Sequence, residues 1–501
     1  MNHSLKILAL CLLPFGQSMA QSSINQLSQK SLNEEGCIAP DSSSFSPNAI
    51  LNNLRKQVQF LNANNTTFSL EQRMKALNIS AVSIAVIKNN KIDWSSAHGV
   101  TTAGNSAATN CHTVFQAASI SKPVTMMAAL RMAEKGVIDL DKNIQSYLTD
   151  FQLPQGKQTS DNPVTFRNIL NHTSGLNSGG YWGYGQDEAI PSDLNIVKGV
   201  KPTNSDALAV LAPPASQLRY SGAGYTLAEL AMQDIFKQPF ESIMKQWIID
   251  PSNMTIADFT QPINRQKHQS IAHGHKADGT TVKGGWRNHP EQAAAGLWTN
   301  AYDLALFLAE IGKGYRGNST VFSKSVINEL FHQEIESHFY GFRTLASGDN
   351  LAIAHYGGTQ GYRSAMVLDV TTGNGAVILT NSNGGSLLTG DILRSVAKHY
   401  QWPYLNAIFV NQNAVDKSSQ LAFVGQYEFN EQDWKIDVIY NEHTNKLSII
   451  FPNKDNYPLT ATDKATHHFI HEDTGVEAEF KTLNNSIEIK LYGQVGEKIS
   501  K

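Results

Sequence analysis

A serine and a lysine three residues apart stand at the head of an unusually apolar segment. Ser119 and Lys122 precede the run 124–130, in which Thr125 is the single polar residue. This spacing on a helix places both side chains on one face, one turn apart, so the amine comes within reach of the hydroxyl. Burial favours a neutral amine that can accept the serine proton, and a helix N-terminus favours developing negative charge. The pair therefore predicts a nucleophilic serine.

The spacing alone is not specific, because the chain contains it twice more, as Ser242 with Lys245 and Ser395 with Lys398. Those two pairs lie in amphipathic segments, where a solvated lysine is expected. Only the first pair opens a segment that is apolar on all sides, as a buried central helix is. Pro123 fits the first turn of a helix but not its interior, which places Ser119 at the N-terminal edge.

Two later segments supply further groups that serine chemistry uses. Tyr220 precedes a Ser-Gly-x-Gly turn that leads into a helix, a position from which its phenol would enter a cleft. His355 is followed by Gly357, Gly358 and an alternating strand. Glycines here allow a ligand to approach the backbone closely, and the N–H of Gly358 with that of Ser119 would form an oxyanion hole.

At these three places the chain resembles the serine β-lactamase and penicillin-binding-protein superfamily. The resemblance is greatest to its class C-type branch, which includes esterases, D-aminopeptidases and D-alanyl-D-alanine carboxypeptidases. Matching segments follow the family's order over roughly residues 76 to 400, an order harder to obtain by chance than any single motif. They are AVSIAVIKNNKIDWSSAHG, TVFQAASISKPVTMMAALRMAEKGVIDLDKNIQSYL, VTFRNILNHTSGL, RYSGAGYTLAEL, AAAGLWTNAYDLALFL and HYGGTQGYRS. The resemblance implies an α/β (α+β) fold, with an antiparallel sheet flanked by helices and a mainly helical subdomain.

The resemblance also implies a role for each matched residue. Ser119 is implied as the acylated nucleophile and Lys122 as its proton acceptor. Tyr220 is implied as the phenol that shares this proton, hands it to the leaving group and later activates water. His355 and Gly357 would belong to a third motif that reads Lys-Thr-Gly in many penicillin-binding proteins and His-x-Gly in many esterases and D-peptidases.

The residue after that motif's glycine supplies an oxyanion N–H in the family, and here it is Gly358. A histidine at His355 also leads us to expect that activity depends on a group titrating near neutrality. The second motif departs from the family's Tyr-x-Asn, because Gly222 stands where the asparagine is expected. The missing amide weakens the case for a β-lactam or peptide substrate more than the case for an ester, because an ester needs less positioning.

Aromatic residues in Gly-rich loops are candidates for the wall of a substrate pocket. Tyr181, Trp182 and Tyr184 are interpreted in this way, with surface-loop packing as an equal alternative. His172 and Trp298 also match family text, and we interpret both as structural.

Composition and further motifs exclude several other functions. The formal net charge of −3 provides no field that would attract nucleic acid. We expect no metal, because the clustered histidines at 273–275 and 467–471 lack accompanying ligands at suitable spacing. The chain has no Gly-rich phosphate loop or dinucleotide fingerprint, so no cofactor is expected.

With 501 residues, the chain is expected to form more than one unit. Residues 1–20 have the layout of a cleaved signal peptide, which predicts a secreted or periplasmic protein of a Gram-negative-type bacterium, without a transmembrane segment. Residues 21–75 are interpreted as an arm with a helix at 50–61, and 76–402 as the hydrolase domain. Short alternating runs in 403–501 predict an all-β small barrel that resembles lipocalin-like domains. Cys37 and Cys111 either pair or remain free thiols.

The sequence therefore predicts a serine hydrolase that forms an acyl-enzyme at Ser119. Its expected substrate is a small-molecule ester, a D-amino-acid-containing peptide or a cell-wall fragment. Two alternatives remain open: a β-lactamase or D-alanyl-D-alanine carboxypeptidase, and a catalytically silent homologue that binds a cell-wall ligand or a partner. The sequence predicts no particular oligomeric state.

Overall fold

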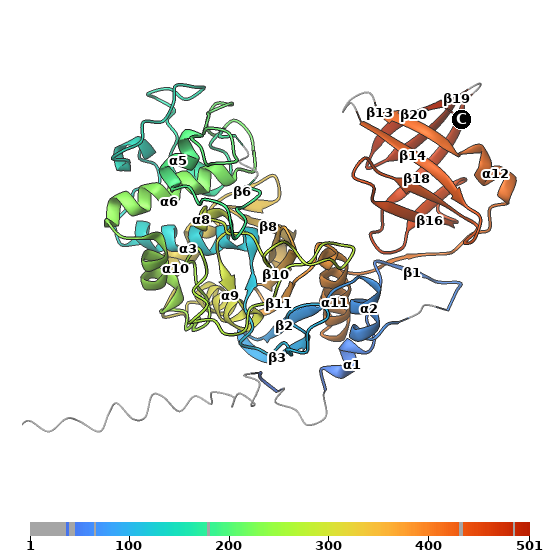
Figure 1. Cartoon of the computed structure of the whole chain (residues 1–501), viewed down its shortest axis with the longest axis horizontal. Coiled ribbons are helices and arrows are strands. Elements are labelled where there is room, and N and C mark those ends of the chain that lie inside the picture. The colour runs from blue at the N-terminus through green and yellow to red at the C-terminus, as the bar shows by residue number, and fades with distance from the viewer. Residues whose placement is uncertain are drawn as a thin grey trace, which may run out of the picture.

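The computed structural model describes residues 37–39, 46–64, 67–177, 181–429, 434–483 and 486–500. The predicted signal peptide lies outside these residues. Figure 1 shows a larger domain, which contains a sheet and most of the helices, beside a separate β-barrel at the C-terminal end. None of the helices in the described ranges is long and apolar enough to cross a membrane.

An antiparallel sheet of eight strands forms the frame of the larger domain, in the order β3-β2-β11-β10-β9-β8-β7-β6. The hairpin of β2 and β3 turns through Asn89 and Asn90, both at positive φ, a conformation that asparagine tolerates. The strands are β2 (Ala81–Lys88), β3 (Lys91–Gly99), β6 (Glu334–Ile335), β7 (His338–Phe339), β8 (Phe342–Ala346), β9 (Ala352–Thr359), β10 (Tyr362–Asp369) and β11 (Asn374–Thr380).

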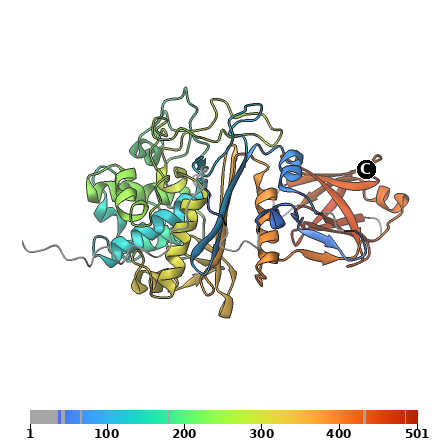
Figure 2. The same cartoon turned by 90° about the horizontal axis from the view of Figure 1, so that it is seen from below.

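Helices cover both faces of this sheet, so both sides of its central strands are buried (Figure 2). One face packs against α3 (Ser121–Glu134) and α9 (Ala301–Tyr315), and the other against α2 (Leu70–Ala76) and α11 (Gly385–His399). As expected for a central helix, residues 121–130 of α3 are all buried. The mixed α/β fold with an antiparallel sheet and flanking helices is thereby confirmed.

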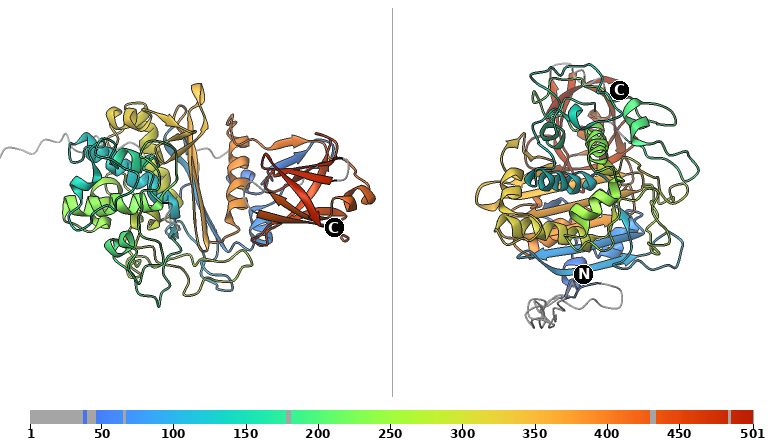
Figure 3. Two further views of the ribbon diagram at one scale, coloured as in Figure 1. Left: turned by 90° about the horizontal axis from the view of Figure 1, so that it is seen from above. Right: turned by 90° about the vertical axis from the view of Figure 1, so that its left-hand side faces the viewer.

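The helical subdomain lies on the α3 side of the sheet (Figure 3). Its longest helix, α6 (Gly222–Phe236), is predominantly buried and packs against the short helix α8 (Gln292–Ala295). The other helices on this side are α4 (Phe166–Leu170), α5 (Asp193–Lys198), α7 (Phe240–Met244) and α10 (Lys324–Leu330). The loop 116–120, which contains Ser119, therefore lies between the sheet and a layer of helices.

The helix predicted at 50–61 is wrong. Helix α1 (Asn48–Leu51) ends early, and β1 (Val58–Phe60) pairs in parallel with β12 (Ile408–Val410). The β-branched and aromatic side chains of Val58 and Phe60 pack with Ile470 of the barrel, so tertiary burial favours an extended chain here.

The C-terminal strands close into an eight-stranded barrel, β13–β20. This closure confirms the small barrel expected from the alternating runs. Strands β16 and β20 also belong to the barrel, although they lie outside those runs. Side chains such as Tyr427, Phe429 and Phe480 fill its interior. The strands are β13 (Gly425–Phe429), β14 (Trp434–Asn441), β15 (Lys446–Ile450), β16 (Asn456–Thr462), β17 (His468–His471), β18 (Glu477–Leu483), β19 (Ser486–Leu491) and β20 (Gln494–Ser500), preceded by α12 (Lys417–Ala422).

A buried ion-pair cluster joins this barrel to the larger domain. The guanidinium of Arg73 on α2 lies 2.8 Å from the Asp391 carboxylate on α11 and 3.0 Å from the Asp473 carboxylate of the barrel. Arg73 is only 5% exposed, so this pairing compensates a charge that has left water.

A disulfide joins Cys37 to Cys111. The sequence left this pairing open, because spacing does not reveal proximity. The bond ties the N-terminal segment to the loop that leads to Ser119, and Asn300 Nδ2 donates to the Cys111 carbonyl from the start of α9.

Candidate active site

The predicted nucleophile lies at a strained turn. Ser119 is partly exposed in a short 3₁₀ segment, Ala118–Ile120, that runs directly into α3. Ala118 has φ of 53°, an unfavourable conformation for a residue with a Cβ. The Ser121 hydroxyl holds this turn, because it donates to the Ala118 carbonyl at 2.7 Å and accepts from the Leu297 N–H at 3.0 Å.

The Lys122 amine points at the nucleophile, as the helical spacing predicted. Its Nζ donates to Ser119 Oγ at 3.3 Å and to the Ala294 carbonyl at 2.8 Å. Lys122 is only 3% exposed, and no carboxylate of the described residues forms an ion pair with it. The amine therefore lies between Ser119 and the backbone of α8, whose Ala294 carbonyl keeps it in contact with the serine.

Tyr220 completes the cluster from the segment just before α6. The Lys122 Nζ lies 4.9 Å from the centroid of the Tyr220 ring, and 45% of Tyr220 is exposed. Ser221 is the N-cap of α6, and its hydroxyl accepts from the Gly224 N–H at 2.9 Å. This bond fixes the start of the helix and so the position of Tyr220, the residue before the cap. The phenol is thus both beside the amine and open to solvent.

His172 lies beneath this tyrosine and has a supporting role. Its ring is 4.4 Å from that of Tyr220, and its Nδ1 accepts from the Ser221 N–H at 3.2 Å. Burial, followed by the charge of Lys122, holds the pKa of His172 well below its ordinary value, so the ring is neutral. These contacts agree with the structural interpretation of His172 from the sequence.

The second motif lacks a side chain at its third position. Gly222 is the buried first residue of α6, and its carbonyl accepts from Thr226 Oγ1. Thr226 in turn shares a hydrogen bond of 2.7 Å with the Tyr181 hydroxyl. Tyr181 therefore packs over the first turns of α6.

The third motif lies along an open strand edge. Strand β9 pairs with β8 only as far as Ala354, whereas its pairing with β10 continues to Thr359, so among the described strands only β10 pairs with 355–359. Gly357 lies against the nucleophile loop: a Cβ built there would be 2.3 Å from the Ala117 carbonyl oxygen. This close approach explains the glycine and brings the backbone of Gly358 to the region of Ser119.

His355 is buried, which overturns the expectation of a group that titrates near neutrality. Desolvation, followed by the charge of Lys122, lowers the pKa of His355 to about 3. The imidazole is therefore neutral at physiological pH. Its Nδ1 has no hydrogen-bond partner among the described residues.

The three predicted pocket aromatics differ in their surroundings. Trp182 is 76% exposed and Tyr181 is partly buried at α6. Tyr184 is buried, and its hydroxyl shares a hydrogen bond with Thr203. These contacts favour interior packing over a pocket wall for Tyr184.

The sequence missed two contributors to the site. Ala294 belongs to a segment that matches the family, but residue types give no sign that its backbone carbonyl accepts a hydrogen bond from Lys122. His338, on the edge strand β7, is close enough that its charge lowers the pKa values of both His172 and His355. Its short hairpin had no pattern that would have placed it there.

Comparisons with known proteins identify the family of the chain. Residues 69–398 match the family model described as Beta-lactamase. The chain belongs to the Beta-lactamase family. Protein flp of Staphylococcus aureus (strain N315) is 23% identical over 324 residues, which is 63% of this chain and 62% of that protein. This chain thus spans less than two thirds of the curated relative's length.

Two solved structures share the fold of this Beta-lactamase family member. The octameric penicillin-binding protein homologue from Pyrococcus abyssi is 18% identical with a TM-score of 0.58, over 86% of this chain and 98% of that one. The D-amino acid amidase from Ochrobactrum anthropi SV3 is 19% identical with a TM-score of 0.52, over 66% of this chain and 96% of that one. At these identities the likeness establishes fold alone.

Proposed function

We propose that this protein is a secreted serine hydrolase that forms an acyl-enzyme at Ser119. The observation that carries the proposal is the 3.3 Å hydrogen bond between Lys122 Nζ and Ser119 Oγ, with the Tyr220 ring against the same amine. The proposal includes removal of residues 1–20 as a signal peptide. Such a site needs no cofactor, because its own side chains supply nucleophile and base.

The proposed reaction has two halves. In acylation, Ser119 Oγ attacks the substrate carbonyl carbon while its proton passes to the Lys122 and Tyr220 pair. The N–H groups of Ser119 and Gly358 stabilise the oxyanion, and the leaving group departs with the proton. In deacylation, water loses a proton to the same pair and attacks the acyl carbon, and the Ser119 hydroxyl is restored.

The site favours esters or D-amino-acid-containing peptides over β-lactams and peptides with a free carboxylate. A bound carboxylate requires a compensating positive charge, and the neutral His355 ring supplies none at physiological pH. Gly222 provides no amide to orient a substrate amide. A labile ester depends least on these two groups.

A silent binding homologue is the second candidate, because Gly222 departs from the family pattern. Against it stands the retained contact between Lys122 and Ser119, which a binding site does not need. If catalysis had been lost, selection would no longer maintain Lys122 and Ser119, and substitutions at both would be tolerated.

The test is intact-protein mass spectrometry after exposure to a fluorophosphonate probe. We expect one adduct on the parent, in which Ser119 Oγ displaces fluoride from phosphorus, and none on Ser119→Ala. Ser242→Ala is the matched control, because it removes a serine of the same Ser-x-x-Lys spacing outside the site, and it should still be labelled. Equal labelling of the parent and Ser119→Ala, or no labelling of either, would refute the proposal.

Labelled enzyme would then be tested on p-nitrophenyl esters, D-amino-acid anilides and a chromogenic cephalosporin. Turnover of esters or D-anilides is expected, and a preference for the cephalosporin would contradict the substrate argument from His355 and Gly222.

A further inference from the structure

A buried carboxyl group joins the two helices that position the lysine and the tyrosine. Glu229 lies on α6, two turns after Tyr220, and has no exposed surface. Its Oε2 accepts from the Ala293 N–H of α8 at 2.8 Å. The next residue of α8, Ala294, is the one whose carbonyl accepts from Lys122 Nζ at 2.8 Å. Glu229 thus lies one residue from the backbone acceptor that holds the amine.

Helix α8 is packed in the core through its alanines, and few hydrogen bonds fix its orientation there. It comprises only the four residues 292–295, and its N-cap, Glu291, makes no side-chain capping hydrogen bond. A helix of this length is not stable by itself. Besides the bond from Lys122, the hydrogen bond between α8 and α3 in the described part of the chain is a long one of 3.4 Å, from Thr125 Oγ1 to the Ala293 carbonyl. The hydrogen bond from the Ala293 N–H to Glu229 therefore ties α8 directly to α6.

We propose that Glu229 is a positioning residue that fastens α8 to α6 and thereby sets Lys122 between Ser119 and Tyr220. The inference rests on the proposed function, since it concerns the same lysine. It explains why a carboxyl group is buried among the helices: Tyr220 enters the site from the start of α6, whereas the carbonyl that holds Lys122 belongs to α8. The bond between Glu229 and Ala293 fixes one relative to the other.

The charge state of Glu229 makes the idea testable by a conservative change. Desolvation, followed by the nearby Asp193, raises its pKa well above the ordinary value, which favours the neutral carboxyl group. A glutamine has the same shape, is also neutral and keeps an oxygen acceptor for the Ala293 N–H. A leucine fills a similar volume but leaves that N–H without an acceptor.

The experiment measures the second-order rate of fluorophosphonate labelling from pH 6 to 10, with the thermal midpoint of each variant. We expect Glu229→Gln to label at close to the parent rate. Glu229→Leu should be slower by about 100-fold, as a displacement of about 1 Å at a reacting group causes, and its pH profile should be shifted because the amine has lost its fixed surroundings. Glu241→Gln is the matched control: Glu241 contacts the same helix through the Gln292 side chain and caps nothing, so this variant should behave as the parent.

Equal rates and pH profiles for Glu229→Leu and Glu229→Gln, with the parent labelled at Ser119, would overturn the positioning role alone. Should Glu229→Leu fail to fold, Glu229→Gln still decides the question, because a folded Gln variant with a large loss of labelling contradicts positioning through an acceptor oxygen. No labelling of the parent would overturn this inference together with the proposed function.

Discussion

Substitution of Gly357 by alanine tests how the site is held together. A Cβ at this position would be 2.3 Å from both the Ala117 carbonyl oxygen and Ser364 Oγ, well inside the 3.0 Å that real Cβ atoms respect. The Ser364 hydroxyl also donates to the Ala117 carbonyl at 2.8 Å. The added methyl group must therefore push strand β9 and the nucleophile loop apart by about 0.7 Å or more, since the backbone carbonyl of Ala117 cannot rotate away as the Ser364 hydroxyl can.

The magnitude follows from this displacement. A shift of about 1 Å between reacting groups costs about 100-fold in rate, and this corresponds to about 2.7 kcal/mol of transition-state stabilisation. The folded state should also lose about 1 to 3 kcal/mol through overpacking. The assays are kcat/KM on a p-nitrophenyl ester, the rate of fluorophosphonate labelling and the urea midpoint.

The neighbouring Gly358→Ala is the matched comparison. A Cβ there approaches the flexible Arg363 side chain no closer than 3.3 Å, and the oxyanion N–H is kept. We expect a much smaller loss for Gly358→Ala than for Gly357→Ala. Equal kcat/KM values for the two variants would refute the argument that the contact at Gly357 sets the distance between β9 and Ser119.

Three further predictions concern other charged or titratable groups. Lys122→Met should lower kcat/KM by about 100- to 10,000-fold through loss of the proton acceptor, and an unchanged value would contradict that role. The pKa of His355 is about 3 when folded against 6.5 ordinarily, so the unfolded chain binds more protons between these values and stability falls as pH falls through that window. His355→Gln should therefore flatten the decline of the urea midpoint from pH 7 to 4, and a parallel decline would disprove burial of the neutral ring. Arg73→Met should cost about 1.5 to 3 kcal/mol in calorimetry, because it removes a charged hydrogen bond from the buried Asp391, which keeps Arg394 as its second partner; a loss below about 1 kcal/mol, as for an exposed pair, would argue against a buried cluster.

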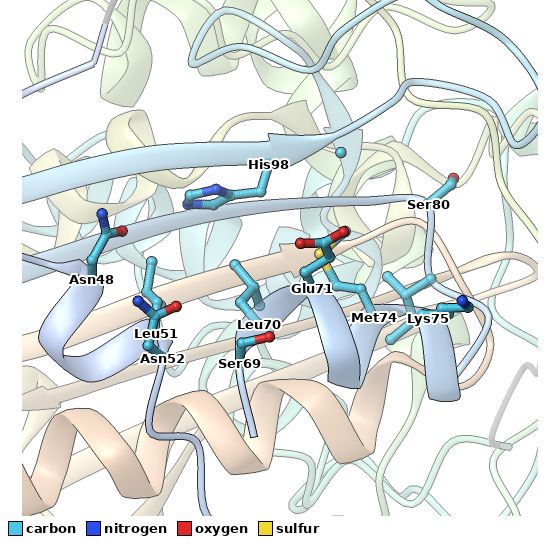
Figure 4. Close-up of a pocket in the computed structure, with 12 residues that line it drawn as sticks. Asn48, Leu51, Asn52, Ser69, Leu70, Glu71, Met74, Lys75, Ser80 and His98 are labelled. Carbon is cyan, nitrogen blue, oxygen red and sulfur yellow. The ribbon is translucent and has the colours of Figure 1, made fainter. Parts of the chain in front are cut away.

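A pocket of about 530 Å³ on the α2 side of the sheet shows that a hollow alone does not identify the active site (Figure 4). Glu71, Lys75 and His98 are among the residues that line it. Helix α3, which bears Lys122, covers the opposite face of the sheet. The chemistry of side chains, rather than the size of a cavity, located the candidate site.

Local patterns in the sequence were sufficient where the deciding interactions are local. The Ser119 and Lys122 spacing placed both groups on one helical turn because helix periodicity acts over a few residues. The Asn89-Asn90 turn specified a hairpin because both residues tolerate positive φ. The helix predicted at 50–61 failed for the opposite reason, since pairing with β12, 350 residues away in the chain, outweighed local propensity. Helix α2, by contrast, has a local sequence signal at its start, the capping box between Ser69 and Gln72.

The sequence by itself determined which groups are present: a serine, a lysine and a phenol in the family's order, and glycines where a strand approaches the nucleophile. Only the tertiary structure decided the hydrogen-bond partners and the protonation of these groups. The carbonyl that holds Lys122 comes from Ala294, 172 residues along the chain. Burial by several elements makes His355 neutral, although its residue type predicted titration near pH 7. Hydrogen-bond partners and desolvation depend on what surrounds a side chain in space, and residue spacing does not encode that environment.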